Sequence, residues 1–416
     1  MNDRVDAADG RRVVVTGLGA VSALGPDLPS LLHGVREGRC GIRTVTLFDT
    51  SDFRTSTGAE LQGFDPGAHF SRRERRRLSR ADMAGLVAAA EALEDAFGPG
   101  GPLPDPAQVG VILGGGVGGL FDSESYYRAV LGSGWEGVPA TRALGHFPCA
   151  TADRIAERYR FGGPRSTVVT ACSSSTLAIG QSCDAVRLGL VDMAVTGGSD
   201  TLSRLTYSGF NALRSVDPDT CRPFDAERKG LSLGEGAAIL VLEPLEAARR
   251  RGARIHAEVL GCGMSSDAHH MTAPHPDGEG ATLAMTQALR LAGLTPDRVG
   301  YINAHGTGTP HNDLAETRAI HAAFGEYGAT VPVSSTKSML GHCLGSAGAM
   351  EALVTVLALR DRFLPPTANL ETPDPECVLN HVPLESRPAE FEAAISNSFA
   401  FGGNNGCLVL GRAEDA

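Results

Sequence analysis

Aromatic residues are scarce in this chain of 416 residues, at 5%, and there is a single tryptophan. No apolar run approaches the ~20 residues that a membrane-spanning helix requires, which argues against an integral membrane protein. The polar segment Met1–Arg12 lacks the apolar core of a secretory signal. The formal net charge of −11 argues against a general nucleic-acid binder.

Cysteine pairing motifs are also missing. The nine cysteines are scattered, with no CxxC pair and no zinc-type spacing. An odd count without a disulfide framework indicates a reducing compartment, so we predict a cytoplasmic protein with no bound metal.

The residues that are present describe a globular α/β protein. The chain is 42% hydrophobic and contains 52 glycines, which indicates tight turns and close backbone packing. Its length predicts two domains or two fused halves. Apolar β-branched runs predict buried strands, and helical patterns alternate with them: strands at 13–17, 109–113, 168–171, 193–197 and 238–242, helices at 30–37 and 81–97.

The second part of the chain repeats the pattern of the first. A new opening strand is expected at 255–261, and another strand at 300–304. The segments 167–192 and 331–361 share the order strand, turn, helix. We therefore predict two related halves, residues 1–250 and 251–416, joined near residues 244–252.

Glycine-rich loops raise the question of nucleotide binding. Gly17 and Gly19 are not followed by a third glycine at the dinucleotide spacing, and no Gly-Lys-Ser/Thr occurs after any such loop. The glycines are expected instead to shape loops around a tunnel.

Cys172 is the first candidate for chemistry. A β-branched strand delivers it to a sharp turn, and a small-residue helix follows from Thr176. A helix N-terminus favours the thiolate, which predicts a lowered cysteine pKa, and its free N–H groups can stabilise an oxyanion. The other eight cysteines are interpreted as structural thiols.

Two histidines lie on separate loop-to-helix turns. His305 follows a strand, and His342 precedes an apolar helix that should be buried. Glu351 lies within that helix, and a buried carboxylate requires a partner, for which Lys337 is the candidate. Near the C-terminus, the aromatic turn around Phe401 is compatible with a gate.

A basic cluster at residues 72–80 stands out on this acidic chain. One interpretation is a solvated helical face. The other is a docking patch that steers an acidic partner.

Several motifs in order resemble one known family, the elongating β-ketoacyl-acyl-carrier-protein synthases of bacterial fatty-acid and type II polyketide pathways. They are the VVVTGLG opening, the TAC elbow, the NAHGTxTP loop, the STKSMxGHxxGxAGxxE segment and the NSFxFGGxN loop, spread from Val13 to about Arg412. The resemblance implies a thiolase-type fold of five α-β-α-β-α layers. It also implies a homodimer, or a heterodimer with a chain-length-factor-like subunit, that acts on acyl-carrier protein.

The resemblance further implies a mechanism and a set of site residues. Cys172 would carry an acyl thioester, and His305 and His342 would assist decarboxylation of malonyl-acyl-carrier protein, with Lys337 and Glu351 organising the site. No cofactor is bound, because the phosphopantetheine arm of the carrier brings the substrate. The remaining implied positions are the oxyanion site and gate at Phe401, Gly402 and Gly403, pantetheine contacts at Thr272, Thr307 and Thr309, an acyl-pocket position at Val117, and carrier docking at Arg72, Arg73, Arg76 and Arg77.

Departures from the family pattern concern the substrate. Ala400 stands where the gate commonly has Gly, Asn404 replaces Thr, Gly308 replaces Ser, and Val117 is smaller than the common Ile. The segment 138–149 does not match the fatty-acid enzymes well. These changes favour a specialised polyketide or polyene pathway, with fatty-acid synthesis still open. A family cation near Asn303 and Asn397 is left undecided.

Three other activities are disfavoured by particular residues. A thiolase would require a second catalytic cysteine, and Cys407 has the pattern of a strand residue. A ketosynthase III or chalcone-type enzyme would carry Asn in place of His342. A non-catalytic chain-length subunit would lack Cys172. An active subunit that works only beside such a partner stays open.

Overall fold

The computed structural model describes residues 11–413. Eleven strands form one mixed sheet in the order β12-β10-β9-β14-β15-β8-β1-β7-β6-β4-β5. At its middle, β1 (Val13–Val21) and β8 (Ala257–Ser266) pair antiparallel. The other strands of the first half are β4 (Val109–Gly114), β5 (Arg165–Val168), β6 (Met193–Asp200) and β7 (Gly236–Pro244). Those of the second half are β9 (Tyr301–Asn303), β10 (Pro332–Ser334), β12 (Asn380–His381), β14 (Ala393–Phe399) and β15 (Asn404–Arg412).

The two halves of the sheet have the same topology. The order β5-β4-β6-β7-β1 in the first half corresponds strand by strand to β10-β9-β14-β15-β8 in the second. The pairing directions also agree. In the first half β4 is parallel to both of its neighbours, β5 and β6, and in the second half β9 is parallel to β10 and β14. The pairs β6–β7 and β7–β1 are antiparallel, and so are the corresponding pairs β14–β15 and β15–β8. The chain is thus built from two related halves, and the exact boundary between them stays a prediction.

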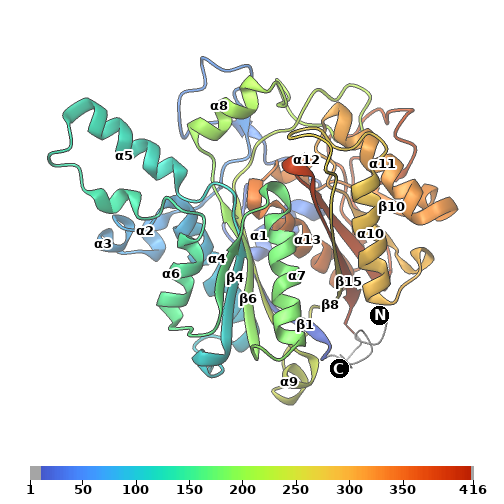
Figure 1. The fold of residues 1–416 in the computed structure, drawn as a ribbon, viewed down its shortest axis with the longest axis horizontal. Helices are drawn as coiled ribbons and strands as arrows, with labels where there is room; N and C mark the ends of the chain where they lie inside the picture. Colours follow the sequence, from blue (N-terminus) through green and yellow to red (C-terminus); the bar gives the residue numbers. More distant parts are fainter. Residues whose placement is uncertain (1–10, 414–416) are drawn as a thin grey trace.

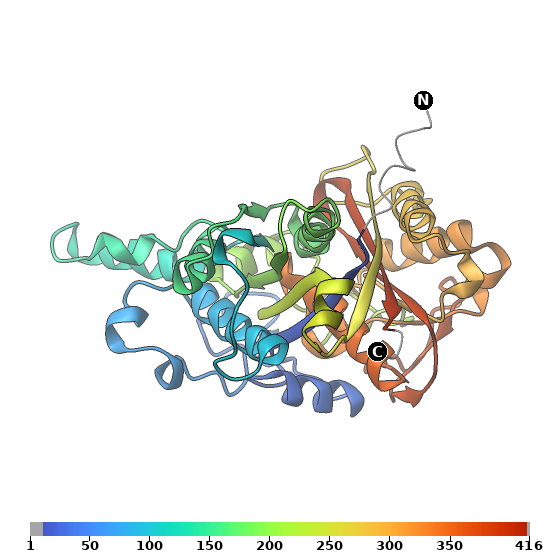
Figure 2. The same ribbon diagram turned by 90° about the horizontal axis from the view of Figure 1, so that it is seen from below.

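Helices form three layers around these half-sheets (Figures 1 and 2). α4 (Arg80–Phe97) and α6 (Ala150–Tyr159) cover the outer face of the first half, and α10 (Glu279–Ala292) and α11 (Pro310–Phe324) cover that of the second. α7 (Ser174–Arg187) and α13 (Ala347–Asp361) lie between the halves in the largest hydrophobic cluster. This is the five-layer, thiolase-type arrangement that the family resemblance implied.

The middle layer is packed backbone against backbone. Every residue of α13 from Ala347 to Leu359 is buried, as expected of a helix that is apolar on all sides. At Gly348 an added Cβ would lie 2.0 Å from Thr176 Oγ1, so only glycine allows this crossing with α7. Ser175 Oγ accepts the Ala349 N–H at 2.8 Å, which joins the two helices near the start of each.

Most predicted elements are present, and one is corrected. The predicted helices correspond to α1 (Leu28–Arg36) and α4, and the predicted strands to β1, β4, β6, β7, β8 and β9. The strand expected at 168–171 is instead β5, which ends at Val168. It forms the edge of the sheet rather than a buried strand, and Val169 just beyond it is 57% exposed.

The remaining elements are short or peripheral. α5 (Leu120–Ser133) extends from the body as an arm (Figure 1). The others are α2 (Pro66–His69), α3 (Arg72–Arg75), α8 (Arg204–Ala212), α9 (Leu245–Arg250), α12 (Lys337–Leu340), β2 (Arg43–Thr44), β3 (Thr57–Gly58), β11 (Phe363–Leu364) and β13 (Arg387–Pro388). Within residues 11–413 no helix is long and apolar enough to cross a membrane.

Candidate active site

Cys172 lies in a tight turn between β5 and α7. Ala171 has φ +53°, a left-handed backbone conformation that disfavours a residue with a Cβ. Ser174 stabilises the turn, because its Oγ donates to the Ala171 carbonyl at 2.6 Å and accepts the Thr170 N–H at 2.9 Å. The strained turn places the Cys172 thiol at the start of α7, where it is 8% exposed.

The expected lowering of the Cys172 pKa is wrong. Burial raises the pKa of the thiol to about 11, against the opposing effects of the Lys337 charge and of the Phe401 and Cys172 N–H groups. The helix N-terminus is present, but removing the sulfur from water outweighs it. One of these N–H groups belongs to Phe401, where the family resemblance implied an oxyanion site, and the other belongs to Cys172 at the helix start.

His305 follows β9 and is held through its own backbone. Glu316 of α11 accepts the N–H groups of His305 and Gly306, both at 2.8 Å. Lys337 Nζ lies 2.7 Å from the His305 carbonyl oxygen and 3.2 Å from Nδ1. Burial, with smaller effects of Lys337 and His342, holds the pKa of His305 well below its usual range. The ring is therefore neutral, and because an ammonium only donates, its proton lies on Nε2.

His342 is also neutral with its proton on Nε2, but a backbone N–H group rather than Lys337 occupies its Nδ1. Its Nδ1 accepts the Leu344 N–H at 3.0 Å, which leaves the ring proton on Nε2. Burial, followed by the charge of Lys337, lowers the pKa of His342 to about 3. Both imidazoles are therefore neutral and have an N–H available to donate.

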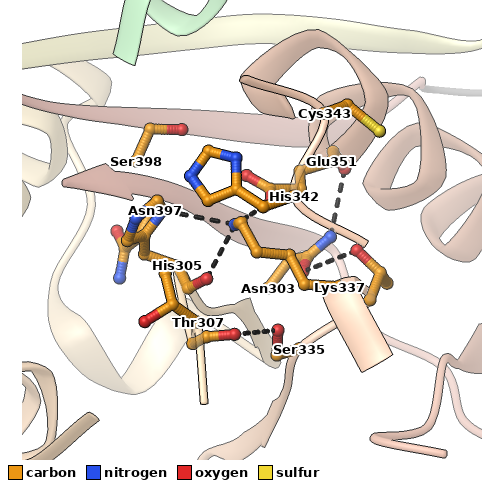
Figure 3. Close-up of polar contacts among 12 residues, drawn as sticks. Asn303, His305, Thr307, Ser335, Lys337, His342, Cys343, Glu351, Asn397 and Ser398 are labelled. Carbon is orange, nitrogen blue, oxygen red and sulfur yellow. Dashed lines mark hydrogen bonds and ion pairs between the residues drawn. The ribbon is translucent and has the colours of Figure 1, made fainter. Parts of the chain in front are cut away.

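The thiol and both imidazoles converge, although they come from three separate turns. Cys172 Sγ and one ring nitrogen from each of His305 and His342 all lie within 4.8 Å of one another. The two rings are nearly perpendicular, at 88°, with centroids 5.6 Å apart. Figure 3 shows His305 and His342 with the buried polar residues around them.

Lys337 and Glu351 are in direct contact, as the sequence predicted. Both side chains are almost fully buried, and the Lys337 ammonium connects Glu351 to His305. Burial raises the pKa of Glu351 to about 7, and the Lys337 charge opposes this rise. Beside them, Asn303 Nδ2 donates to the Glu351 carbonyl at 3.1 Å.

A cavity of about 370 Å³ connects Cys172 to the surface. Thr272, Thr307 and Thr309 line it together with His305. Thr307 and Thr309 join their hydroxyls at 2.8 Å. The ring of Phe401 stacks on Phe210 at 5.7 Å, and both rings line this cavity. Phe401 therefore borders the same cavity as the thiol.

Other predicted positions lie elsewhere. Val117 does not line the cavity but packs in the hydrophobic cluster that contains Leu344. Gly402 and Gly403 have φ of +82° and +74° and shape the turn after Phe401. Cys407 is a buried residue of β15, as the argument against a thiolase expected. The candidate docking residues are exposed on α3 and the turn after it, at Arg72, Arg73, Arg76 and Arg77.

The sequence missed the carboxylates that hold the catalytic loops. Besides Glu316, Asp313 accepts the N–H groups of Thr307 and Phe224, and Asp200 accepts those of Gly116 and Gly345. Phe210 was also missed. Asp313 and Glu316 follow the NAHGTxTP loop at helical spacing, which was an available signal, whereas nothing local marks Asp200.

An unpaired oxygen lies close to Glu316. Asn397 donates through Nδ2 to Glu316 Oε1 at 3.2 Å, and its buried Oδ1 has no partner among the described residues. The unpaired Asn397 Oδ1 and the neighbouring Glu316 carboxylate are oxygen ligands that fit the monovalent cation left undecided by the sequence near Asn303 and Asn397. No step of the chemistry below depends on it.

The fold and the site together define an acyltransferase of the thiolase type. The family model for the N-terminal domain of β-ketoacyl synthase matches residues 10–248, and that for the C-terminal domain matches residues 256–371. The chain belongs to the β-ketoacyl synthase family.

Individual relatives agree over almost the whole length. The chain is 42% identical to 3-oxoacyl-acyl-carrier-protein synthase 2 of Coxiella burnetii, covering 97% of this chain and 99% of that protein. It is also 42% identical to the Synechocystis protein of the same name, over 96% and 98%. Among solved structures, the ishigamide ketosynthase/chain length factor matches with TM-score 0.92 and 37% identity, over 97% of this chain and all of that one. A ketosynthase in complex with its chain length factor from Xenorhabdus doucetiae matches with TM-score 0.82 and 32% identity, over 97% and 98%.

Proposed function

We propose that this chain catalyses the decarboxylative Claisen condensation of malonyl-acyl-carrier protein with an acyl group held on Cys172. The observation that carries the proposal is the convergence of one buried thiol with two neutral imidazoles, beside a surface cavity that Cys172 and His305 line. A nucleophile and two hydrogen-bond donors are what the two halves of this reaction need.

In the loading half, Cys172 Sγ attacks the carbonyl carbon of the acyl thioester. The carbon–sulfur bond to the pantetheine breaks, and the proton of the Cys172 thiol ends on the departing pantetheine sulfur. The oxyanion formed during the attack lies between the N–H groups of Cys172 and Phe401, which both contact the sulfur. Because the resting thiol has a raised pKa, its proton leaves only as the sulfur attacks.

In the condensing half, malonyl-acyl-carrier protein loses carbon dioxide, and the electron pair moves into an enolate. The Nε2–H groups of His305 and His342 donate to the enolate oxygen, and neutral donors suit this role because they are not consumed by proton transfer. The enolate carbon then attacks the acyl carbonyl on Cys172. The carbon–sulfur bond to Cys172 breaks, and its thiolate regains a proton from solvent.

The cavity provides the path for the carrier's arm. We assign Thr272, Thr307 and Thr309 to the pantetheine amides, since their hydroxyls line the route from the surface to Cys172. We assign Phe401, which stacks on Phe210 in the wall of the cavity, as the gate. The turn at Gly402 and Gly403 allows it to move.

We assign carrier docking to the exposed arginines at 72, 73, 76 and 77. Acyl-carrier proteins present acidic helices, and a dense basic patch on an enzyme with net charge −11 would orient such a partner. No ion pair of these four guanidinium groups is found among the described residues, so they are available to a partner.

A second copy of this chain is the partner that we propose for the edge of the sheet. Within residues 11–413 no strand pairs with the outer side of β5. Large apolar residues on the α5 arm and after it are exposed: Tyr127, Leu131, Trp135, Leu144 and Phe147. An edge strand and an apolar arm can pair with themselves about a two-fold axis. A chain-length-factor-like subunit is the alternative occupant, and native mass spectrometry of the purified chain distinguishes the two. We also propose a cytoplasmic enzyme, since all nine thiols are free.

Intact-protein mass spectrometry tests the loading half. After incubation with acyl-carrier proteins bearing short, long and conjugated acyl groups, the wild type should gain one acyl adduct. Cys172→Ala should abolish the adduct, whereas Cys149→Ala, which removes an exposed thiol, should leave it unchanged. Loading that survives in Cys172→Ala would overturn the nucleophile assignment.

The same experiment addresses the substrate. Ala400, Asn404 and Val117 depart from the fatty-acid pattern, and we propose that the preferred acyl group comes from a polyketide or polyene pathway. Preference for a long saturated chain would assign the enzyme to fatty-acid synthesis.

His342→Ala should load normally but fail to decarboxylate malonyl-acyl-carrier protein.

A further inference from the structure

Asp200, the last residue of β6, is a fully buried carboxylate that accepts hydrogen bonds only from backbone N–H groups among the described residues. Its Oδ2 accepts the N–H groups of Gly116 and Gly345, both at 2.7 Å. Its Oδ1 accepts those of Val117 and Gly118, both at 3.0 Å. Within residues 11–413 no arginine, lysine or histidine forms an ion pair with it, so four peptide groups alone solvate the charge.

Asp200 joins segments from both halves of the fold. Gly116–Gly118 belongs to the loop after β4 in the first half, whereas Gly345 lies in the second half, just beyond His342. The segments touch so closely that a Cβ on Gly345 would lie 2.4 Å from Gly116 N and 2.6 Å from Asp200 Oδ2. A side chain at Gly345 would therefore force these segments apart.

The junction leads directly to His342. Leu344 has φ +54°, an unfavourable conformation for a residue with a Cβ, which is maintained only when its surroundings hold it. In that conformation two consecutive N–H groups have different acceptors. The Leu344 N–H donates to His342 Nδ1 at 3.0 Å, and the Gly345 N–H donates to Asp200.

We propose that Asp200 is a positioning residue for His342, which anchors the strained Leu344–Gly345 peptide so that His342 keeps its proton on Nε2. The inference rests on the proposed function, because His342 acts there as a donor to the enolate. It predicts that loss of Asp200 harms decarboxylation, for which His342 is needed, more than acyl loading, for which it is not.

Asp200→Asn is the most informative variant, because it keeps the shape of the side chain but replaces one of the two acceptor oxygens of the carboxylate by a donor NH₂ group. An amide has one acceptor oxygen and one donor NH₂ group, so two of the four peptide N–H groups would face a donor. Burial raises the pKa of Asp200 to about 6, so at pH 7 the wild type has the charged form that accepts all four. In either orientation the amide therefore leaves two of the four peptide N–H groups without an acceptor.

Two half-reactions are measured in parallel on the full-length enzyme. Decarboxylation of malonyl-acyl-carrier protein is expected to fall about 10- to 100-fold in Asp200→Asn, as for other groups that orient a ligating or donating histidine. Acyl loading of Cys172, which does not use the His342 N–H, should fall much less. Asp82→Asn is the matched control: Asp82 is also fully buried and accepts the Ser79 N–H, but it caps α4 and does not contact the His342 turn. It should leave both half-reactions unchanged.

The ring state of His342 is measured separately. In protein labelled with ¹⁵N-histidine, the His342 signals are identified by their loss in His342→Asn. The wild type should show protonated Nε2 and unprotonated Nδ1, and Asp200→Asn should show a mixture. If Asp200→Asn does not fold, Gly345→Ala replaces it, since its Cβ must separate Gly345 from the carboxylate while the charge stays.

The outcomes separate the two proposals. Normal decarboxylation and an unchanged ring in a folded Asp200→Asn or Gly345→Ala would overturn the role of Asp200. An equal fall in loading and decarboxylation would reduce Asp200 to a packing role and also overturn it. Absence of decarboxylation in the wild type would instead contradict the proposed function.

Discussion

Lys337 Nζ lies between the carboxylate of Glu351 and two atoms of His305, the carbonyl oxygen at 2.7 Å and Nδ1 at 3.2 Å. One ammonium thus neutralises a buried acid and fixes the ring of a candidate catalytic histidine. The arrangement makes the stability and the activity of this site separable by mutation.

Removing one partner of the Lys337–Glu351 pair should be costly. Glu351→Leu or Lys337→Met leaves an uncompensated buried charge, which is expected to lower the free energy of unfolding by about 3–5 kcal/mol. The double variant Lys337→Met with Glu351→Leu should recover most of that loss but stay inactive in decarboxylation. Urea unfolding of the four proteins measures the coupling. Glu157→Gln, which breaks an exposed pair with Arg154, is the control and should cost below about 1 kcal/mol. Additive losses in the four proteins would contradict the coupling.

Alkylation of Cys172 should be slow at neutral pH and should accelerate with pH. Because burial raises the thiol pKa to about 11, the reactive thiolate is a small fraction at pH 7 and rises about tenfold per pH unit below that pKa. Peptide mass spectrometry after brief iodoacetamide exposure between pH 6 and 9.5 follows the rate, with the exposed Cys149 as internal reference. A rate that levels off below pH 8 would contradict the raised thiol pKa and would mean that the helix N-terminus lowers it more than desolvation raises it.

Two glycine-to-alanine changes should have opposite effects. Helix propensity alone favours alanine by about 1 kcal/mol at either position. Gly209 in α8 has nothing within 4 Å of an added Cβ, so Gly209→Ala should stabilise the protein by about 0.5–1 kcal/mol. At Gly348 the Cβ would meet Thr176 at 2.0 Å, and overpacking should cost about 1–3 kcal/mol or more. Chemical unfolding measures both, and a stabilised Gly348→Ala would disprove the close crossing of α13 and α7.

Charge reversal in the basic patch should weaken carrier binding without affecting the chemistry. Arg73→Glu with Arg76→Glu is expected to raise KM for acyl-carrier protein about tenfold at low salt, and the effect should shrink as salt screens it. kcat with a small acyl-pantetheine thioester should stay unchanged. Arg290→Glu, an exposed arginine on α10 at the opposite side of the molecule in Figure 1, serves as the control. An equal rise in KM for Arg290→Glu would indicate a general charge effect.

The amino-acid sequence determined the local features of this protein. Hydrophobic runs and punctuating glycines located the main strands and helices, and the spacing of motifs singled out Cys172, His305, His342, Lys337 and Glu351. The Lys337–Glu351 pairing followed from the rule that a buried carboxylate needs a partner. The elements and the Lys337–Glu351 contact could be predicted because each depends on a short stretch of chain, whereas the catalytic roles of the five residues stay predictions.

The tertiary structure decided what depends on burial and on contacts between distant segments. The raised pKa of Cys172 results from desolvation, which no local pattern shows, and it reverses the effect of the helix N-terminus. Asp200 is separated by 145 residues from Gly345, whose N–H it accepts. β5 resembled a buried strand until the sheet order placed it at an edge. In each case the environment of the residue, which exists only after folding, sets its chemistry.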